Sequence, residues 1–295
     1  MTWQRLLETR DRLPAQPLEE WYGSLLERLG EATPFELAIL GGRLAATPGL
    51  AFLAGYQGAL RLLWPSAPRS LGALCVTEAR SVRPADMQVR LDGLSLNGRK
   101  DFVTAADAAD WLLVAAREEA DGEAPRLALT VVRNGAPGVR IEPLPALPLM
   151  PDIPHARLHL DGAHCERLAG DGWDAYVKPF RSLEDLHVIA AVSAWLLGVG
   201  QDSGWPPALR MRLLGLLAGA AEVARLCATS PVMHVMLAGL FAEFDGLCSE
   251  LDAAFASGPA QLATLWTRDQ GLLAIAGAAR ATRLAKAREA LGLAD

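Results

Sequence analysis

A change of pattern along the chain constrains its fold more than any other feature of the sequence. Between Ser70 and about Gly172, glycines and prolines separate short apolar runs, whereas the flanking segments carry apolar residues at helical spacing. The short runs have strand length and lie at residues 72–77, 87–91, 112–116, 127–132 and 156–160. This order predicts an α+β fold in which helices precede and follow a central antiparallel β-domain.

The first region, at residues 1–66, is predicted to be helical. Apolar residues recur every three or four positions over 18–29, and Gly30 ends this helix. Thr33-Pro34 has the residue types of an N-cap followed by a proline in the first turn, and Pro48 begins a further helix.

The last region is predicted to form a four-helix bundle. Proline and glycine turns divide it into helical segments at residues 182–199, 207–228, 231–256 and 260–291. Short connections favour antiparallel neighbours, as in helix bundles. The predicted domains are the N-terminal helical region at 1–66, the β-domain at 67–175 and the bundle at 176–295.

Composition argues against several classes of partner. The net charge of -6 and the isoelectric point near 5.5 disfavour binding to nucleic acid, which needs a basic surface. The longest apolar run, at 188–200, is too short to cross a bilayer, and the N-terminus lacks the apolar core of a signal peptide. The four cysteines are widely spaced, as expected for reduced thiols. We expect a cytoplasmic protein without nucleic-acid or membrane partners.

Three short motifs follow one another in the β-domain. They are Val76-Thr77-Glu78, then Asn97-Gly98-Arg99-Lys100-Asp101-Phe102-Val103-Thr104, then Asp110-Trp111. Asn-Gly is typical of a hairpin turn, which predicts that Gly98 lies in such a turn. None of these motifs is diagnostic alone, but their ordered combination resembles the β-domain of the acyl-CoA dehydrogenases, with its V-T-E and G-x-K-x-[WF]-x-T segments.

This resemblance implies a FAD-dependent oxidoreductase that acts on CH–CH groups of acyl thioesters such as acyl-CoA. Val76 and Thr77 match the positions that meet the pyrimidine edge of the isoalloxazine, an edge that needs matched polar groups in a dry pocket. Phe102 matches the aromatic residue that packs against the flavin, and Thr104 matches the threonine that bonds near its reactive nitrogen.

The sequence departs from the family after Glu78. The family usually has P-G-A-G-S-D there, a loop whose amides approach the cofactor pyrophosphate, whereas this chain has Ala79-Arg80-Ser81-Val82-Arg83-Pro84. Arg80 or Arg83 either replaces those amide contacts with charge or is a solvated loop residue. The R-x-x-F-G and Q-x-x-G-G-x-G segments of the family also have no counterpart in residues 1–295.

The family reaction needs a carboxylate that removes the α-proton while the β-hydrogen leaves as hydride. In a minority of members this base lies in an L-E-R-L segment on the first bundle helix, which corresponds here to Leu183-Glu184-Asp185-Leu186. Glu184 is therefore the candidate base. The alternative is that Ser182, Glu184 and Asp185 mark a helix N-terminus, where acids complement the dipole. Adjacent acids should also raise each other's pKa.

Other clusters of basic residues and histidines do not indicate a catalytic or metal site. The last predicted helix carries several basic residues, including Arg280 and Arg283, which either meet an anionic ligand or complement the dipole near the end of the helix. The spacing of His155, His159 and His164 along a strand does not suggest a metal site.

Three functions remain open from the sequence. The first is a FAD-dependent acyl-CoA dehydrogenase-like enzyme. The second is a flavin-free, non-catalytic relative that serves as a binding or partner subunit, and the third is a flavoprotein oxidase or monooxygenase of the same fold. The resemblance also implies a homo-oligomer formed through the bundle, or pairing with a longer relative.

Overall fold

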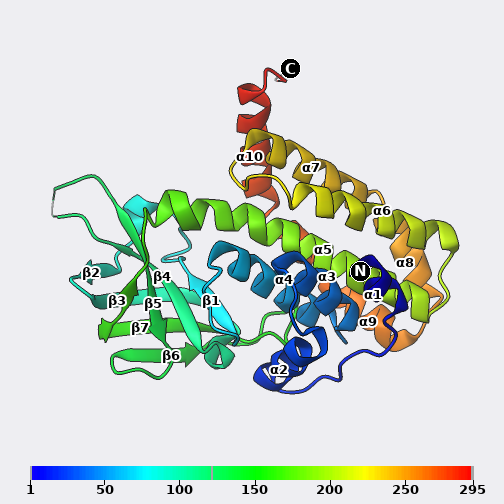
Figure 1. Cartoon of the computed structure of the whole chain (residues 1–295), viewed down its shortest axis with the longest axis horizontal. Coiled ribbons are helices and arrows are strands. Elements are labelled where there is room, and N and C mark those ends of the chain that lie inside the picture. Colours follow the sequence, from blue (N-terminus) through cyan, green and yellow to red (C-terminus); the bar gives the residue numbers. More distant parts are fainter. Residues whose placement is uncertain (1, 121, 294–295) are drawn as a thin grey trace.

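The computed structural model describes residues 2–120 and 122–293 and confirms the α+β class (Figure 1). Its first helices are α1 (Thr2–Glu8), α2 (Leu18–Leu29), α3 (Pro34–Leu44) and α4 (Pro48–Leu63). Thr33 caps α3 in a capping box with Glu36, and Thr47 caps α4, each followed by a proline in the first turn. The predicted starts of these two helices are therefore confirmed.

The β-domain contains one sheet. Its strands are β1 (Gly72–Cys75), β2 (Arg90–Asp92), β3 (Ser95–Thr104), β4 (Trp111–Arg117), β5 (Leu127–Arg133), β6 (Val139–Pro143), β7 (His155–His164) and β8 (Glu166–Arg167). They lie in the order β6-β7-β3-β2-β4-β5-β8, with β1 paired to β4. The sheet is mixed and not purely antiparallel as predicted, because β1 and β2 both run parallel to β4.

Two glycines, Gly72 and Gly98, lie within strands of this sheet. A Cβ on Gly72 would lie 2.2 Å from Cζ2 of Trp111, its partner on β4, so only glycine fits beside that indole. Gly98 does not lie in a turn as predicted. It lies within β3 with φ of 130°, at a shift of register against β7, and the turn before β3 is formed by Gly93-Leu94.

The C-terminal region contains more helices than predicted. They are α5 (Lys178–Asp202), α6 (Pro207–Val223), α7 (Pro231–Asp245), α8 (Cys248–Ala256), α9 (Ala260–Asp269) and α10 (Gly277–Ala290). The predicted helix at 231–256 breaks at Gly246-Leu247, where Leu247 turns into the core. The predicted helix at 260–291 breaks at a 3-10 turn that buries Leu272 and Leu273. Both breaks bury leucines, Leu247 at the first and Leu272 and Leu273 at the second.

The long helix α5 joins the two halves of the molecule, running from the sheet into the helical part (Figure 1). It packs against α3, α4 and α6, and a Cβ on Gly42 of α3 would lie 2.1 Å from the Ala191 carbonyl oxygen of α5. By length and composition alone, residues 173–202 and 231–256 are long and apolar enough to cross a membrane, but 94% of the apolar window of the first is buried within the protein. The apolar character of α5 is that of a core helix.

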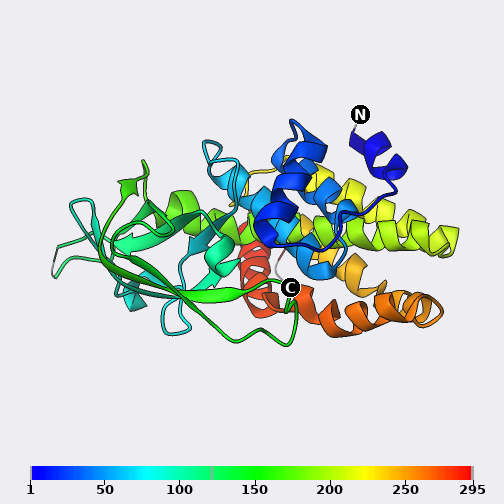
Figure 2. The same ribbon diagram turned by 90° about the horizontal axis from the view of Figure 1, so that it is seen from below.

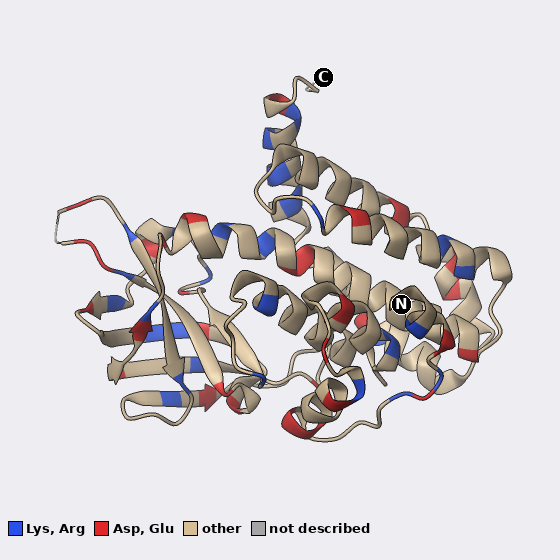
Figure 3. Cartoon of the chain, viewed as in Figure 1, with Lys and Arg blue, Asp and Glu red and all other residues tan. Residues whose placement is uncertain are grey.

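The last helix, α10, packs against α7. It crosses α7 and projects beyond it, and both views place it at the junction between the sheet and the helical half (Figures 1 and 2). Basic residues are spaced along its length (Figure 3). The end of α10 near α5 therefore brings cations close to the β-domain.

Candidate functional site

A cavity of about 720 Å³ lies between the β-domain, α4, α5 and the segment 272–283. This volume is within the range of small-molecule sites, roughly 300–1,000 Å³. All of the residues selected from the sequence as cofactor-binding or catalytic line it: Val76, Thr77, Phe102, Thr104 and Glu184. The structure thus brings together side chains from the end of β1, from β3 and from α5.

A buried ion pair positions the segment after β1. Lys100 of β3 is fully buried, and its ammonium lies 2.5 Å from the Glu78 carboxylate and donates to the Val76 carbonyl oxygen at 3.2 Å. The Asp101 amide donates to the Thr77 carbonyl oxygen at 2.8 Å. Burial lowers the pKa of Lys100, and the Glu78 charge opposes that shift. These contacts attach Val76 and Thr77 to the strand that carries Phe102 and Thr104.

The loop that replaces the glycine-rich loop of the family is a tight turn. Glu78 and Ser81 exchange two backbone hydrogen bonds, at 3.0 and 2.7 Å, around Ala79 and Arg80, whose φ angles are 46° and 65°. Two positive φ angles in a two-residue connection are typical of a type I′ turn, which favours Asn and Gly. The Ala79 amide donates to the Asp101 carboxylate at 2.6 Å. The amides of Glu78, Ala79 and Ser81 are therefore already bound to protein oxygens.

The two loop arginines differ in position. Arg80 lines the cavity, and no hydrogen bond or ion pair joins its side chain to the residues that the structure describes. Both side chains are exposed, but Arg83 is not part of the lining. If one of the two arginines replaces the amide contacts of the family loop with charge, its position favours Arg80.

Sequence reasoning missed Tyr56 of α4. Its hydroxyl accepts a hydrogen bond from the Leu74 amide at 2.8 Å and lies beside the Thr104 hydroxyl. The Phe180 ring meets the Tyr56 ring edge-on, with centroids 5.7 Å apart. Burial raises the pKa of Tyr56 above its ordinary value, so the phenol stays protonated. Only its place on a predicted apolar helix was visible in the sequence.

His155 is a second residue whose position the sequence did not reveal. Its ring lies against that of Phe102, with centroids 4.5 Å apart, and it pairs with Thr104 in the sheet. The side chain lines the cavity, is 4% exposed, and its Nδ1 has no hydrogen-bond partner among the described residues. Burial lowers the pKa of His155 to about 4, so the imidazole is neutral near pH 7.

Glu184 lies well inside α5. Because this helix begins at Lys178, the alternative that Glu184 marks a helix N-terminus is wrong. Its carboxyl group is partly buried in the cavity wall, and no hydrogen bond or ion pair joins it to the described residues. Burial and the neighbouring Asp185 charge raise the pKa of Glu184 to about 8, while Arg283 and Arg181 oppose the shift. The predicted effect of adjacent acids is confirmed for Glu184.

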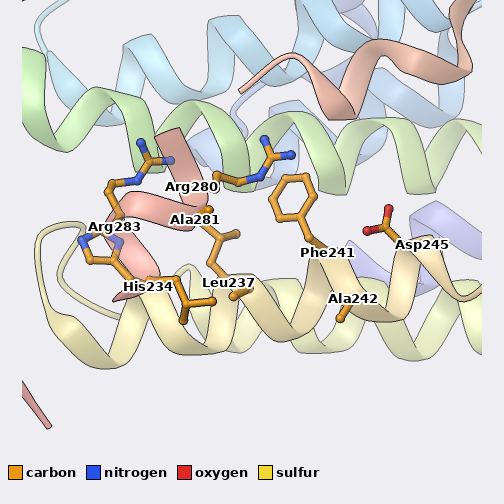
Figure 4. Close-up of a pocket in the computed structure, with 10 residues that line it drawn as sticks. His234, Leu237, Phe241, Ala242, Asp245, Arg280, Ala281 and Arg283 are labelled. Carbon is orange, nitrogen blue, oxygen red and sulfur yellow. The ribbon is translucent and has the colours of Figure 1, made fainter. Parts of the chain in front are cut away.

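Asp185 ties α5 to α10. One carboxylate oxygen accepts from the Arg280 guanidinium at 3.1 Å and the other from Arg283. The Arg280 guanidinium also lies over the Phe241 ring, 3.7 Å from the ring centroid (Figure 4). Burial raises the pKa of Asp185, and the two guanidinium groups oppose that shift. Arg280 and Arg283 lie in the first half of α10, so they do not complement the dipole at the end of the helix.

A smaller cavity of about 190 Å³ lies on the other side of this ion-pair group, between α7 and α10. His234 and Asp245 from α7 line it together with Arg280 and Arg283, as Figure 4 shows. Phe241, Arg280 and Arg283 are shared by the linings of both cavities. They form the wall between the two.

Comparison with known proteins agrees with this architecture. Residues 76–163 match the sequence model of the acyl-CoA dehydrogenase middle domain. No curated protein matches the chain. The resemblance inferred from the β-domain motifs is confirmed.

Several solved structures share the fold over most of the chain. PigA with FAD and proline is 14% identical, with coverage of 99% of this chain and 96% of that chain and a TM-score of 0.68. Butyryl-CoA dehydrogenase from Megasphaera elsdenii is 14% identical, with coverage of 91% and 85% and a TM-score of 0.63. FkbI, described as acting in biosynthesis of the methoxymalonyl extender unit of Fk520, is 22% identical, with coverage of 93% and 96% and a TM-score of 0.57. The chain has the acyl-CoA dehydrogenase fold.

Proposed function

We propose that this protein is a flavin-dependent oxidoreductase that oxidises a CH–CH bond of an acyl thioester, with Glu184 as the base. One observation carries the proposal. The residues that match the flavin-ring positions of the family and the residue that matches its alternative base line a single cavity.

The cavity fits the ring end of FAD better than the diphosphate end. Thr77 and Thr104 offer hydroxyl groups beside the aromatic face of Phe102, which is 37% exposed, and His155 adds an unpaired nitrogen. At the diphosphate end the turn amides are occupied, and Arg80 would supply charge in their place. When bound there, the flavin would supply the electron acceptor for the hydride.

Glu184 suits proton abstraction for two reasons. Its carboxylate oxygens have no protein partner among the described residues, whereas both oxygens of Asp185 bind arginines. Apolar side chains such as Phe180, Val188 and Leu273 line the same cavity, exclude water and keep the pKa of Glu184 near 8. A base with a pKa close to the working pH is effective.

For the substrate class the proposal draws on a relative of the same fold, and for the assembly it draws on the family resemblance. Butyryl-CoA dehydrogenase is named for an acyl-CoA substrate, and we extend acyl thioesters, FAD and oligomer formation to this chain as parts of the proposal. Size-exclusion chromatography with light scattering tests the assembly. A homogeneous monomer would contradict it.

Absorption spectroscopy tests the function. Purified protein incubated with FAD and desalted should keep a flavin band, and anaerobic butyryl-CoA should bleach it. Glu184→Gln should keep the flavin and lose the bleaching. Glu243→Gln, at an exposed position of α7, is the matched control and should bleach as the wild type does.

The occupied turn amides favour a second candidate, the flavin-free binding or partner subunit. It predicts no retained flavin under either condition. Retained flavin without bleaching by any acyl-CoA would instead favour an oxidase or monooxygenase.

A further inference from the structure

Arg181 is an unpaired cation in the wall of the main cavity. It lies on α5 one turn before Glu184 and is partly buried, and no hydrogen bond or ion pair joins its side chain to residues 2–120 or 122–293. Nearby cations, in contrast, are paired with carboxylates. Arg280 and Arg283 bind Asp185, and Lys178 pairs with Asp174 at 3.3 Å. Arg181 therefore keeps its full hydrogen-bonding capacity for a ligand.

The charge around Arg181 is positive although the chain as a whole has a net charge of -6. Four arginines line the cavity, namely Arg80, Arg181, Arg280 and Arg283, against the two carboxyl groups of Glu184 and Asp185. Because the pKa of Glu184 is about 8, that carboxyl is mostly neutral at pH 7. A cation in a partly apolar wall loses hydration, and an anionic ligand compensates for this loss.

We propose that Arg181 binds a carboxylate carried by the acyl group, so that the substrate is the thioester of a short dicarboxylic acid. This inference rests on the proposed function, because it takes Glu184 as the group that meets the α-carbon. Residues three apart on a helix lie on one face, about one turn or 5 Å along the axis. The substrate carboxylate would thus lie close to the carbon that loses its proton, which favours a short acid.

The same spacing gives Arg181 an electrostatic role. A carboxylate bound near Glu184 would by itself disfavour ionisation of the base. The planar guanidinium pairs with the carboxylate in a bidentate manner and neutralises it. The flavin diphosphate is the other anion that this cation could meet, but Arg80 lies in the turn that replaces the pyrophosphate loop, whereas Arg181 lies beside the base.

Binding of two acyl-CoA probes tests the proposal on the full-length protein as purified. Calorimetry at pH 7 would measure the Kd of succinyl-CoA and of butyryl-CoA, and absorption would measure the flavin content of the same samples. The wild type should bind succinyl-CoA about ten-fold more tightly, since one charged hydrogen-bonded pair contributes at about that level. Arg181→Gln should remove the preference and leave the butyryl-CoA Kd and the flavin content unchanged.

Two further variants control for charge and geometry. Arg181→Lys should keep part of the preference, because lysine retains the charge but not the planar fork. Arg225→Gln removes an arginine that is 77% exposed outside the cavity and should behave as the wild type.

The outcomes separate this inference from the proposed function. Equal affinity of the wild type for the two probes, or no binding of either, would overturn the inference. Loss of flavin from Arg181→Gln with the preference intact would assign Arg181 to the diphosphate and also overturn it. A succinyl-CoA preference in a protein without flavin would contradict the proposed function alone.

Discussion

Replacing Asp185 with asparagine should lower the pKa of Glu184. Asp185 acts on its neighbour in two ways, as an adjacent negative charge and as the partner that engages Arg280 and Arg283. Asparagine removes the charge and leaves the two guanidinium groups uncompensated beside Glu184. Both changes favour the ionised base, so the shift is downward from about 8 towards the ordinary value of 4.5.

The size of the shift can be bounded from general magnitudes. One nearby like charge or one freed opposite charge typically moves a pKa by about one unit or more. With a pKa of about 8, roughly 1% of Glu184 is ionised at pH 6. A fall of about one unit raises that fraction about ten-fold, and flavin bleaching at pH 6 should accelerate by the same factor.

Stopped-flow bleaching by butyryl-CoA between pH 5.5 and 9 would measure the effect. Because the base acts when ionised, the wild-type rate should rise with pH to a plateau through an inflection near the pKa of about 8. In Asp185→Asn that inflection should move to lower pH. Asp174→Asn, which changes an exposed acid before α5, is the control and should leave the inflection in place. An unchanged or higher inflection in Asp185→Asn would refute the electrostatic coupling.

Three other changes test parts of the same site. Glu184→Gln should flatten the pH dependence of stability. The pKa of this carboxyl is raised to about 8 in the folded state from 4.5, so its stabilising contribution is lost as the pH rises through that interval. The melting temperature of the wild type should therefore fall more between pH 6 and 9 than that of the variant. Arg80→Gly should raise the free energy of unfolding, measured by urea titration, by roughly 0.5–1 kcal/mol because it relieves a positive φ. Arg83→Gly is the control: its φ is -77°, so the same titration should show a lower free energy of unfolding. Lys100→Met leaves the buried Glu78 charge without its cation and should lower the free energy of unfolding by about 3 kcal/mol. The variant should also retain FAD more weakly after desalting. A loss of unfolding free energy under about 1 kcal/mol would contradict the positioning role of this ion pair.

The sequence predicted the parts of the fold that depend on local chemistry. Thr33 and Thr47, each before a proline, begin helices in the structure because caps and first-turn prolines act within a few residues. Strands were found where short apolar runs alternate with turn residues. The broken helix at Gly246 and the direction of β1 were missed, since periodicity reports which residues are buried and not which element covers them.

For the candidate site, too, the sequence determined one part and the tertiary structure another. The sequence alone determined the order of helices and strands, and its motifs identified Val76, Thr77, Phe102, Thr104 and Glu184 as candidates. Only the tertiary structure decided that these five line one cavity and that Tyr56, His155 and Arg181 join them there. Only it decided that Asp185 binds Arg280 and Arg283, and hence what sets the pKa of Glu184. Caps and strand patterns arise from neighbours along the chain, whereas burial and charge pairing arise between residues that folding brings together.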